Sequence, residues 1–312
     1  MQYLGEIISL VVAMLWTATA LFANEASRRI GAMSTNLFRM VLSSILLAGL
    51  LWIVIGHPYP AFADGKTWLW LGLSALVGYV FGDFCLFNAY VVIGARFGQL
   101  FMTLAPVFAA FAGWILLGET LSWKAWLAMA VTLTGISISI LNRSRDGHKL
   151  SLRLPLKGVL LGIGAGLGQG VGLVLSKIGM QYYEAALPAD APAAFDWAMP
   201  FASTMIRSLT GLVGFFALMA LGGTLPKLRA AVRDGAGLKY TALTTVFGPF
   251  VGVSLSLMAV QYARAGIAST LMALTPVIIL LPYWLIYKQK ITPKEFLGVI
   301  ISVTGVALFF LL

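Results

Sequence analysis

Apolar residues occur in long runs separated by short polar segments along the whole chain. Each run is long enough to form a helix that crosses about 30 Å of hydrocarbon. The pattern predicts ten membrane-spanning helices, at residues 3–24, 35–55, 67–90, 96–117, 121–141, 156–177, 199–222, 239–262, 267–287 and 293–312. Most connections are short, so consecutive helices are expected to be antiparallel neighbours. The longer connections are 142–155, which is basic, and 178–198, where acidic residues and prolines indicate a solvated loop.

Composition supports an all-α integral membrane protein without a soluble domain. The chain is 60% hydrophobic and 10% charged, whereas soluble domains are about 45–50% apolar and about 25% charged. A net charge of +10 would fit binding to nucleic acid, but no loop interleaves aromatic residues with a long basic run.

The single Cys85 excludes an internal disulfide and argues against a cysteine metal site. We recognise no cofactor or metal motif and no catalytic constellation, so an enzyme is not expected. The first apolar run lacks a basic n-region and a cleavage site, which favours a retained helix over a signal peptide.

A long stretch of the sequence occurs twice. Residues 95–140 align without a gap to residues 265–310, a constant shift of 170 positions, with the matches Pro106/Pro276, Trp114/Trp284 and Gly135/Gly305 among others. Upstream, the pairs Gly78/Gly248 and Gly82/Gly252 keep this shift, and Arg39 aligns with Arg207 at a shift of 168. We therefore predict two five-helix repeats, 1–141 and 156–312, joined by the basic linker 142–155. Because five is odd, the second repeat is inverted, an architecture of secondary transporters with a site between the repeats near the midplane.

Lysine and arginine in the loops predict the orientation. Loops after spans 1, 3, 5, 7 and 9 hold 15 such residues, and the alternate loops hold 4, namely Lys66, Lys124, Lys177 and Arg264. The positive-inside rule then favours external termini in a multi-pass protein of the cell (inner) membrane.

Several motifs resemble the drug/metabolite transporter superfamily, EamA type, over essentially the whole chain. They are Arg39 opening span two, the segment Ile93-Gly94-Ala95 after span three, Pro106 in span four, Leu117-Gly118-Glu119 after it, and Gly135 in span five. The resemblance implies ten helices around a central cavity and the export or exchange of small metabolites such as amino acids. Members are often drawn with cytoplasmic termini, opposite to the loop count. The second repeat departs from the motif, with Tyr287-Lys288-Gln289 in place of Leu117-Gly118-Glu119.

Asp83, in span three, is the sharpest chemical signal. An ionisable group inside a membrane is costly and usually faces a cavity or a charged partner. Asp83 is therefore a candidate for binding protons or a substrate amine, or else a structural partner of an arginine. Its equivalent in the second repeat is Val253.

The arginines Arg39 and Arg207 lie within spans two and seven. Arg39 is expected at a depth similar to that of Asp83 and is able to pair with it; snorkelling to lipid phosphates is the alternative. No carboxylate occupies the position symmetric to Asp83, so Arg207 is a candidate for bidentate binding of an anionic substrate group. The alternative for Arg207 is pairing with a loop acid or backbone carbonyls.

Other residues are candidates for moving parts and for ligand contacts. Pro106 and Pro276 are expected to kink their helices and provide hinges. Glu119 is expected to cap the following helix, with gating as the alternative. Gln169, Asn88 and Gln99 are candidate hydrogen-bonding groups, and Tyr79 and Trp16 are candidate cavity aromatics or packing residues. In span six, the stripes Gly162/Gly166/Gly170 and Gly164/Gly168/Gly172 indicate close helix packing or flexibility.

The function predicted from these residues is secondary active transport of small metabolites such as amino acids by alternating access, as an exporter or exchanger, with protons as a candidate coupling ion. The partners are then a small-molecule substrate and the lipid bilayer. The alternative is a multidrug exporter of lipophilic cations, which would use the acid and the aromatics without an arginine.

Overall fold

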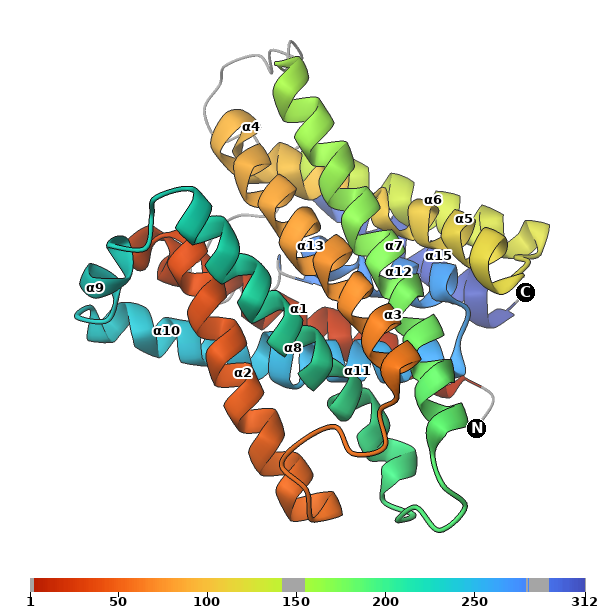
Figure 1. Cartoon of the computed structure of the whole chain (residues 1–312). Coiled ribbons are helices and arrows are strands. Elements are labelled where there is room, and N and C mark those ends of the chain that lie inside the picture. The colour runs from red at the N-terminus through yellow and green to blue at the C-terminus, as the bar shows by residue number, and fades with distance from the viewer. Residues whose placement is uncertain (1–2, 142–154, 279, 281–291, 312) are drawn as a thin grey trace.

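The computed structural model describes residues 3–141, 155–278, 280 and 292–311, which are helical almost throughout (Figure 1). The first repeat contains α1 (Leu4–Ile30), α2 (Ala32–Ile55), α3 (Gly65–Ala75), η1 (Leu76–Asp83), α4 (Phe84–Met102), α5 (Ala105–Leu117) and α6 (Trp123–Leu141). The second contains α7 (Leu156–Ala186), α8 (Phe195–Leu221), α9 (Lys227–Ala231), α10 (Gly235–Thr245), η2 (Val246–Phe250), α11 (Gly252–Tyr262), α12 (Ala265–Met272), α13 (Thr275–Ile278) and α15 (Pro293–Leu311).

The helices confirm an all-α multi-pass membrane protein. Eight helical segments in the described ranges are long and apolar enough to span a membrane. The predicted fifth span corresponds to α6, and the ninth begins at α12 and continues into 281–291, outside the described residues. The count of ten is therefore approximate, but the class is the predicted one.

Two predicted connections are wrong. The loop expected between spans three and four, near residues 91–95, is helical, and the chain instead breaks at Thr103 and Leu104. The loop expected at 178–198 is shorter, because α7 continues to Ala186 and α8 begins at Phe195. Helix α7 continues through the polar residues Gln181 and Glu184, so hydropathy underestimates its length.

The same cap begins α3 and α10, which are equivalent helices of the two repeats. The Asp64 carboxylate accepts a hydrogen bond from the Thr67 amide at 2.7 Å, and Asp234 accepts one from the Gly237 amide at 2.8 Å. An aspartate at the N-cap satisfies an amide that the helix leaves unpaired. The two caps are 170 residues apart, which extends the sequence repeat into the loops.

The first helix of each repeat packs against the other repeat. Helix α1 contacts α10, α11 and α12, whereas α7 contacts α3, η1, α4 and α5. In Figure 1 α7, in green, runs along the orange α3–α4 segment, and α2 lies beside α8. The contacts of one repeat thus have counterparts in the other, as expected for a two-fold relationship between them.

The final helices of the two repeats, α6 and α15, pack tightly together. A Cβ added to Gly135 would collide with Ser302, and one added to Gly305 would collide with Thr132. Ser302 is Thr132 shifted by 170 and Gly305 is Gly135 shifted by 170, so the contact is reciprocal. A reciprocal contact is what an axis of two-fold symmetry produces. It explains why the glycine pair recurs in the sequence.

Helix α7 is closely flanked on both glycine stripes. A Cβ on Gly168 would lie 2.7 Å from the Cα of Gly82, and one on Gly172 would lie 2.8 Å from the Cα of Gly78. On the other stripe, a Cβ on Gly166 would lie 2.9 Å from the carbonyl oxygen of Phe101. These contacts favour the packing interpretation of the stripes over flexibility.

Candidate functional site

Two π-helical segments interrupt equivalent helices where the repeats meet. η1 begins at Leu76 and η2 begins at Val246, again 170 residues apart. A π-helix inserts one residue into the turn and disturbs the regular backbone hydrogen bonding, which is frequent at functional sites. In η2 the backbone of Gly248 is non-helical, with φ −91° and ψ −106°. The hydropathy pattern gives no signal of these segments, because one extra residue leaves an apolar run apolar.

Arg207 of α8 lies against η1. Its guanidinium carbon is 4.6 Å from the centroid of the Tyr79 ring, and its Nη2 is 3.2 Å from where a Cβ on Gly78 would be. Arg207 is only 4% exposed, and its Nε has no hydrogen-bond partner among the described residues. The Tyr79 ring partly compensates the buried charge by a cation–π contact. The guanidinium keeps a free donor, as required for binding an anionic group.

Asp83 ends η1 and is held by a side chain from the other repeat. Its Oδ1 accepts a hydrogen bond from Nε2 of Gln169 in α7 at 2.8 Å. The same Nε2 donates to the carbonyl oxygen of Gly78 at 3.1 Å. Gln169 therefore joins the carboxylate to the π-helical backbone, and the amide fixes the position of the acid without neutralising it.

Arg39 of α2 occupies the corresponding place beside η2. Its Nη1 donates to Oδ1 of Asn36 at 2.7 Å, and its Nη2 is 3.4 Å from where a Cβ on Gly248 would be. Its Nε is buried without a partner in the described ranges, and its guanidinium contacts η2 of the other repeat. Asp83 interacts electrostatically with both Arg39 and Arg207. Although both side chains are described, no ion pair joins Arg39 and Asp83.

The two arginines are equivalent under the repeat, but their surroundings differ. Where Gln169 lies against Gly82, Trp16 of α1 lies against Gly252, with its Cδ1 3.1 Å from where a Cβ would be. Val253 replaces Asp83, and it is buried. At equivalent positions of the interface between the repeats, Gln169 and Asp83 thus lie beside η1, and Trp16 and Val253 lie beside η2. Trp16, Tyr79, Gln169, Asp83, Arg39 and Arg207 are all part of this interface.

Asn88 is not drawn into this cluster. Its side-chain amide donates to the carbonyl oxygen of Phe84, one turn earlier in α4, at 2.7 Å. The side chain of Gln99 lies outside the described residues.

Pro106 and Pro276 lie directly after equivalent helix breaks. Helix α4 ends at Met102 and α5 begins at Ala105, and α12 ends at Met272 and α13 begins at Thr275. Each proline thus occupies the first turn of a new helix, where its missing N–H costs little. The expected kink takes the form of a two-residue turn, in which Thr103, Leu104 and Ala273 keep right-handed helical φ/ψ. The hinge role of the prolines remains a prediction.

Glu119 connects the repeats at one end of the molecule. Its Oε1 lies 2.6 Å from Nζ of Lys177 in α7, and its Oε2 accepts a hydrogen bond from the Ala265 amide at 2.8 Å. Lys177 also donates to the carbonyl oxygen of Ala263 at 2.7 Å. Glu119 therefore caps α12 of the other repeat, and not the helix that follows it as the sequence predicted. Lys177, assigned to a loop from the sequence, lies inside α7 and was missed as its partner.

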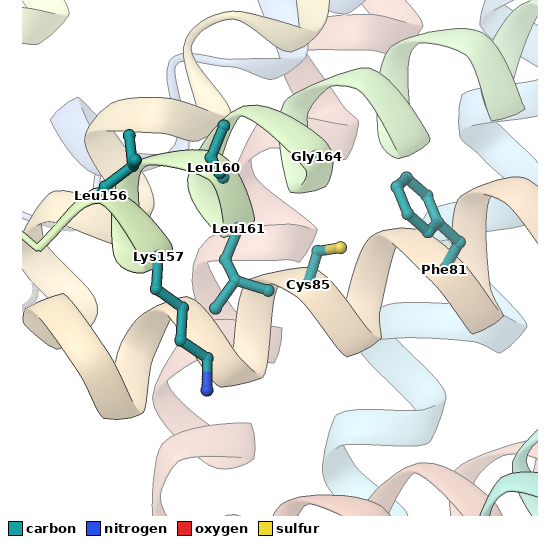
Figure 2. A pocket seen from close by; sticks show the side chains of 7 residues that line it. All are labelled: Phe81, Cys85, Leu156, Lys157, Leu160, Leu161 and Gly164. Atoms are coloured by element: carbon teal, nitrogen blue, oxygen red, sulfur yellow. The ribbon is translucent and has the colours of Figure 1, made fainter.

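Two surface hollows accompany these elements. Figure 2 shows the first, of about 500 Å³, between the η1–α4 segment and the start of α7; its lining is Phe81, Cys85, Leu156, Lys157, Leu160, Leu161 and Gly164. This lining is apolar apart from Lys157 and includes none of the polar residues of the repeat interface. The second hollow, of about 270 Å³, lies beside Glu119 between Trp114 and Trp126. Trp114 is 58% exposed, so its ring faces outward.

Two symmetry-related helical repeats with buried guanidinium and carboxylate groups where they meet define a multi-pass membrane transporter of small molecules. The model of the EamA-like transporter family matches residues 3–141 and 156–311. The chain therefore belongs to this family, within the drug/metabolite transporter superfamily.

Solved structures support the same fold. A crystal structure with 17% sequence identity aligns over 100% of this chain and 98% of its own, with a TM-score of 0.71. At this identity the likeness concerns the fold alone. No curated protein matches the chain.

Proposed function

We propose that the protein is a secondary active transporter of the inner membrane that exports or exchanges amino acids and related carboxylate-bearing zwitterions by alternating access. The observation that carries the proposal is Arg207, a buried guanidinium with an unpartnered Nε beside the amide-bound carboxylate of Asp83. A guanidinium remains charged in proteins and matches the geometry of a carboxylate. An α-carboxylate bound by Arg207 would bring its ammonium towards Asp83.

The break before each proline supports alternating access. In sequence, each break is a short turn between the π-helical segment and the end of its repeat, and an interrupted helix bends more easily there than a continuous one. The ion pair between Glu119 and Lys177 joins the two repeats at one end of the interface. The pair must separate when that end opens. Asp83 is the candidate coupling group, since a membrane carboxylate that contacts the substrate amine is able to exchange it for a proton.

The alternative function, export of lipophilic cations, fits the charges less well. Two guanidiniums interact electrostatically with one carboxylate, so a cation entering this site would meet net repulsion. Tyr79 and Trp16 would offer aromatic surfaces, but the Tyr79 ring is already covered by Arg207.

Counterflow in proteoliposomes tests the proposal. We expect labelled amino acids to exchange, unlabelled amino acids to compete, and quaternary ammonium compounds to compete poorly. Arg207→Gln is expected to reduce exchange by about tenfold or more, since a charge-assisted hydrogen bond contributes about 1.5–3 kcal/mol. Arg29→Gln is the matched control, because Arg29 forms an exposed pair with Glu25 and contacts none of the site residues in the described ranges. Wild-type exchange by Arg207→Gln, or exchange of quaternary ammonium in place of amino acids, would exclude the proposal.

A further inference from the structure

The charges where the repeats meet do not balance. Arg39 and Arg207 contribute two guanidiniums, and Asp83 contributes one carboxylate. Both ion pairs in the described ranges, Arg29–Glu25 and Lys177–Glu119, involve other residues. Because an unpaired charge inside a membrane is costly, a charged substrate group would complement guanidiniums that no ion pair in the described ranges involves.

Each guanidinium is placed to receive an anionic group. Nε of Arg39 and Nε of Arg207 are both buried and lack a hydrogen-bond partner among the described residues. Each Nη2 packs against a π-helical glycine, 3.4 Å from the Cβ position of Gly248 for Arg39 and 3.2 Å from that of Gly78 for Arg207, so the absence of a side chain admits the guanidinium. The repeat thus provides the same anion-binding element twice. An α-amino acid with one carboxylate would use only one of them.

We infer that the preferred substrate is an acidic amino acid, whose two carboxylates bind Arg207 and Arg39 and whose ammonium binds Asp83. The inference rests on the proposed function and names the substrate class of the same site. Three fixed charges, two positive and one negative, are then complemented by three substrate charges of opposite sign. The substrate has a net charge of −1 and neutralises the net charge of +1 on these three side chains.

The surroundings of the two arginines differ, and this difference indicates which carboxylate of the substrate binds Arg207 and which binds Arg39. Asp83 is fixed by Gln169 beside η1, the segment against which Arg207 packs. The ammonium and the α-carboxylate of an amino acid are on one carbon, so they fit Asp83 and Arg207. The side-chain carboxylate then reaches Arg39 beside η2, where Trp16 and Val253 provide apolar surface for the intervening methylene groups. Arg39 is accordingly the specificity-determining residue.

Competition among three nearly isosteric compounds tests the inference. Glutamate carries both carboxylates and the ammonium, glutamine lacks the second carboxylate, and glutarate lacks the ammonium. In counterflow with purified protein, we expect glutamate to compete at least about tenfold better than either of the others, given the strength of charge-assisted bonds. Arg39→Gln should bring the glutamate-to-glutamine ratio close to one, and Asp83→Asn should bring the glutamate-to-glutarate ratio close to one. Arg39→Lys, which keeps the charge, should retain part of the preference.

The outcomes separate this inference from the proposed function. If glutamine competes as well as glutamate, or if Arg39→Gln leaves their ratio unchanged, acidic specificity is wrong while amino acid transport stands. If glutarate competes as well as glutamate, the substrate is a dicarboxylate and the role given to Asp83 is wrong. If none of the three competes, the proposed function fails as well. Ratios within one variant do not depend on the amount of folded protein, so partial misfolding does not obscure the result.

Discussion

The ammonium of Lys177 lies 2.6 Å from the carboxylate of Glu119, and the two residues belong to different repeats. Both side chains are only 14% exposed. In sequence, the position equivalent to Glu119 is Gln289. Helices α1 and α7 are related by a shift of 153, as for Trp16 and Gln169, so the position equivalent to Lys177 is Asn24. In the sequence, the charged pair therefore corresponds to two amide residues at the equivalent positions. This difference in sequence gives the two repeats a reason to differ in the energy of opening.

Removing one partner of this ion pair should destabilise the protein. Glu119→Gln keeps an oxygen to accept from Ala265 but leaves Lys177 charged and unpaired, and Lys177→Met leaves Glu119 unpaired. Loss of one partner of a buried pair costs about 3–5 kcal/mol. We expect thermal unfolding in detergent to show a clearly lower Tm for each single variant and a less than additive loss for the double variant.

The exposed pair Arg29–Glu25 offers a control within the same chain. Its side chains are 42% and 34% exposed, so Glu25→Gln should change stability by about 1 kcal/mol or less. Additive effects of Glu119→Gln and Lys177→Met would show that the two residues are not coupled.

Tyr79→Phe should affect substrate binding without reducing stability. The hydroxyl of Tyr79 is buried and has no hydrogen-bond partner in the described ranges, so its removal relieves an unsatisfied group. The phenyl ring retains the cation–π contact with Arg207. If the hydroxyl contacts the substrate, KM should rise by about tenfold while the Tm stays equal or increases.

Tyr79→Leu distinguishes the contribution of the aromatic ring from that of the hydroxyl. It removes the cation–π contact and should lower the Tm as well as affinity. Equal KM values for wild type and Tyr79→Phe would show that the hydroxyl does not contact the substrate.

Gly168→Ala should prevent α7 from packing on η1. The added methyl would lie 2.7 Å from the Cα of Gly82 and 2.8 Å from the carbonyl oxygen of Val77, and backbone atoms do not move aside easily. We expect a large decrease in Tm and in the yield of monodisperse protein. Gly49→Ala is the control, since nothing lies within 4 Å of its Cβ position in α2 and alanine favours a helix. A tolerated Gly168→Ala would contradict the close contact between these helices.

Asp64 provides a prediction about pH. The hydrogen bond from Thr67 lowers the pKa of the Asp64 carboxyl below its ordinary value. A lowered folded-state pKa means that the ionised cap stabilises the fold above the unfolded pKa, and that this stabilisation is lost as the pH falls through the folded pKa. Asp64→Ala should therefore lower the Tm at pH 7, and its difference from wild type should shrink below pH of about 4. Asp64→Asn keeps a capping side chain and tests the charge alone. A difference that is constant with pH would rule out the ionised cap.

Sequence reasoning captured the scaffold because its signals are local. Apolar run length predicted the spans, and the pairs Gly135/Gly305 and Pro106/Pro276 predicted the repeat, since each represents a close contact or a helix start that only a few residue types permit. The site was predicted in part. Asp83, Gln169, Arg207 and Arg39 are all at the repeat interface, because polar residues are too costly to lie elsewhere in a membrane.

The missed features depend on three-dimensional neighbours. Glu119 caps α12 and pairs with Lys177, both from the other repeat, and no local pattern predicts a partner in another repeat. The weak similarity between α1 and α7 concealed that Trp16 and Gln169 are equivalent. The packing of Gly168 on Gly82 and of Trp16 on Gly252 made that equivalence visible.

The packing of α1 against the second repeat has a consequence for biosynthesis. Helix α1 is made first, but its partners α10, α11 and α12 begin at Gly235 or later. At about 5–20 residues per second, roughly 10–40 s separate the first helix from these partners. During that time α1 has α2 as its neighbour, and the interior face of α3 awaits α7. The two repeats are therefore not independent folding units, and a chain that stops after α6 would leave its own first helix without most of its native contacts.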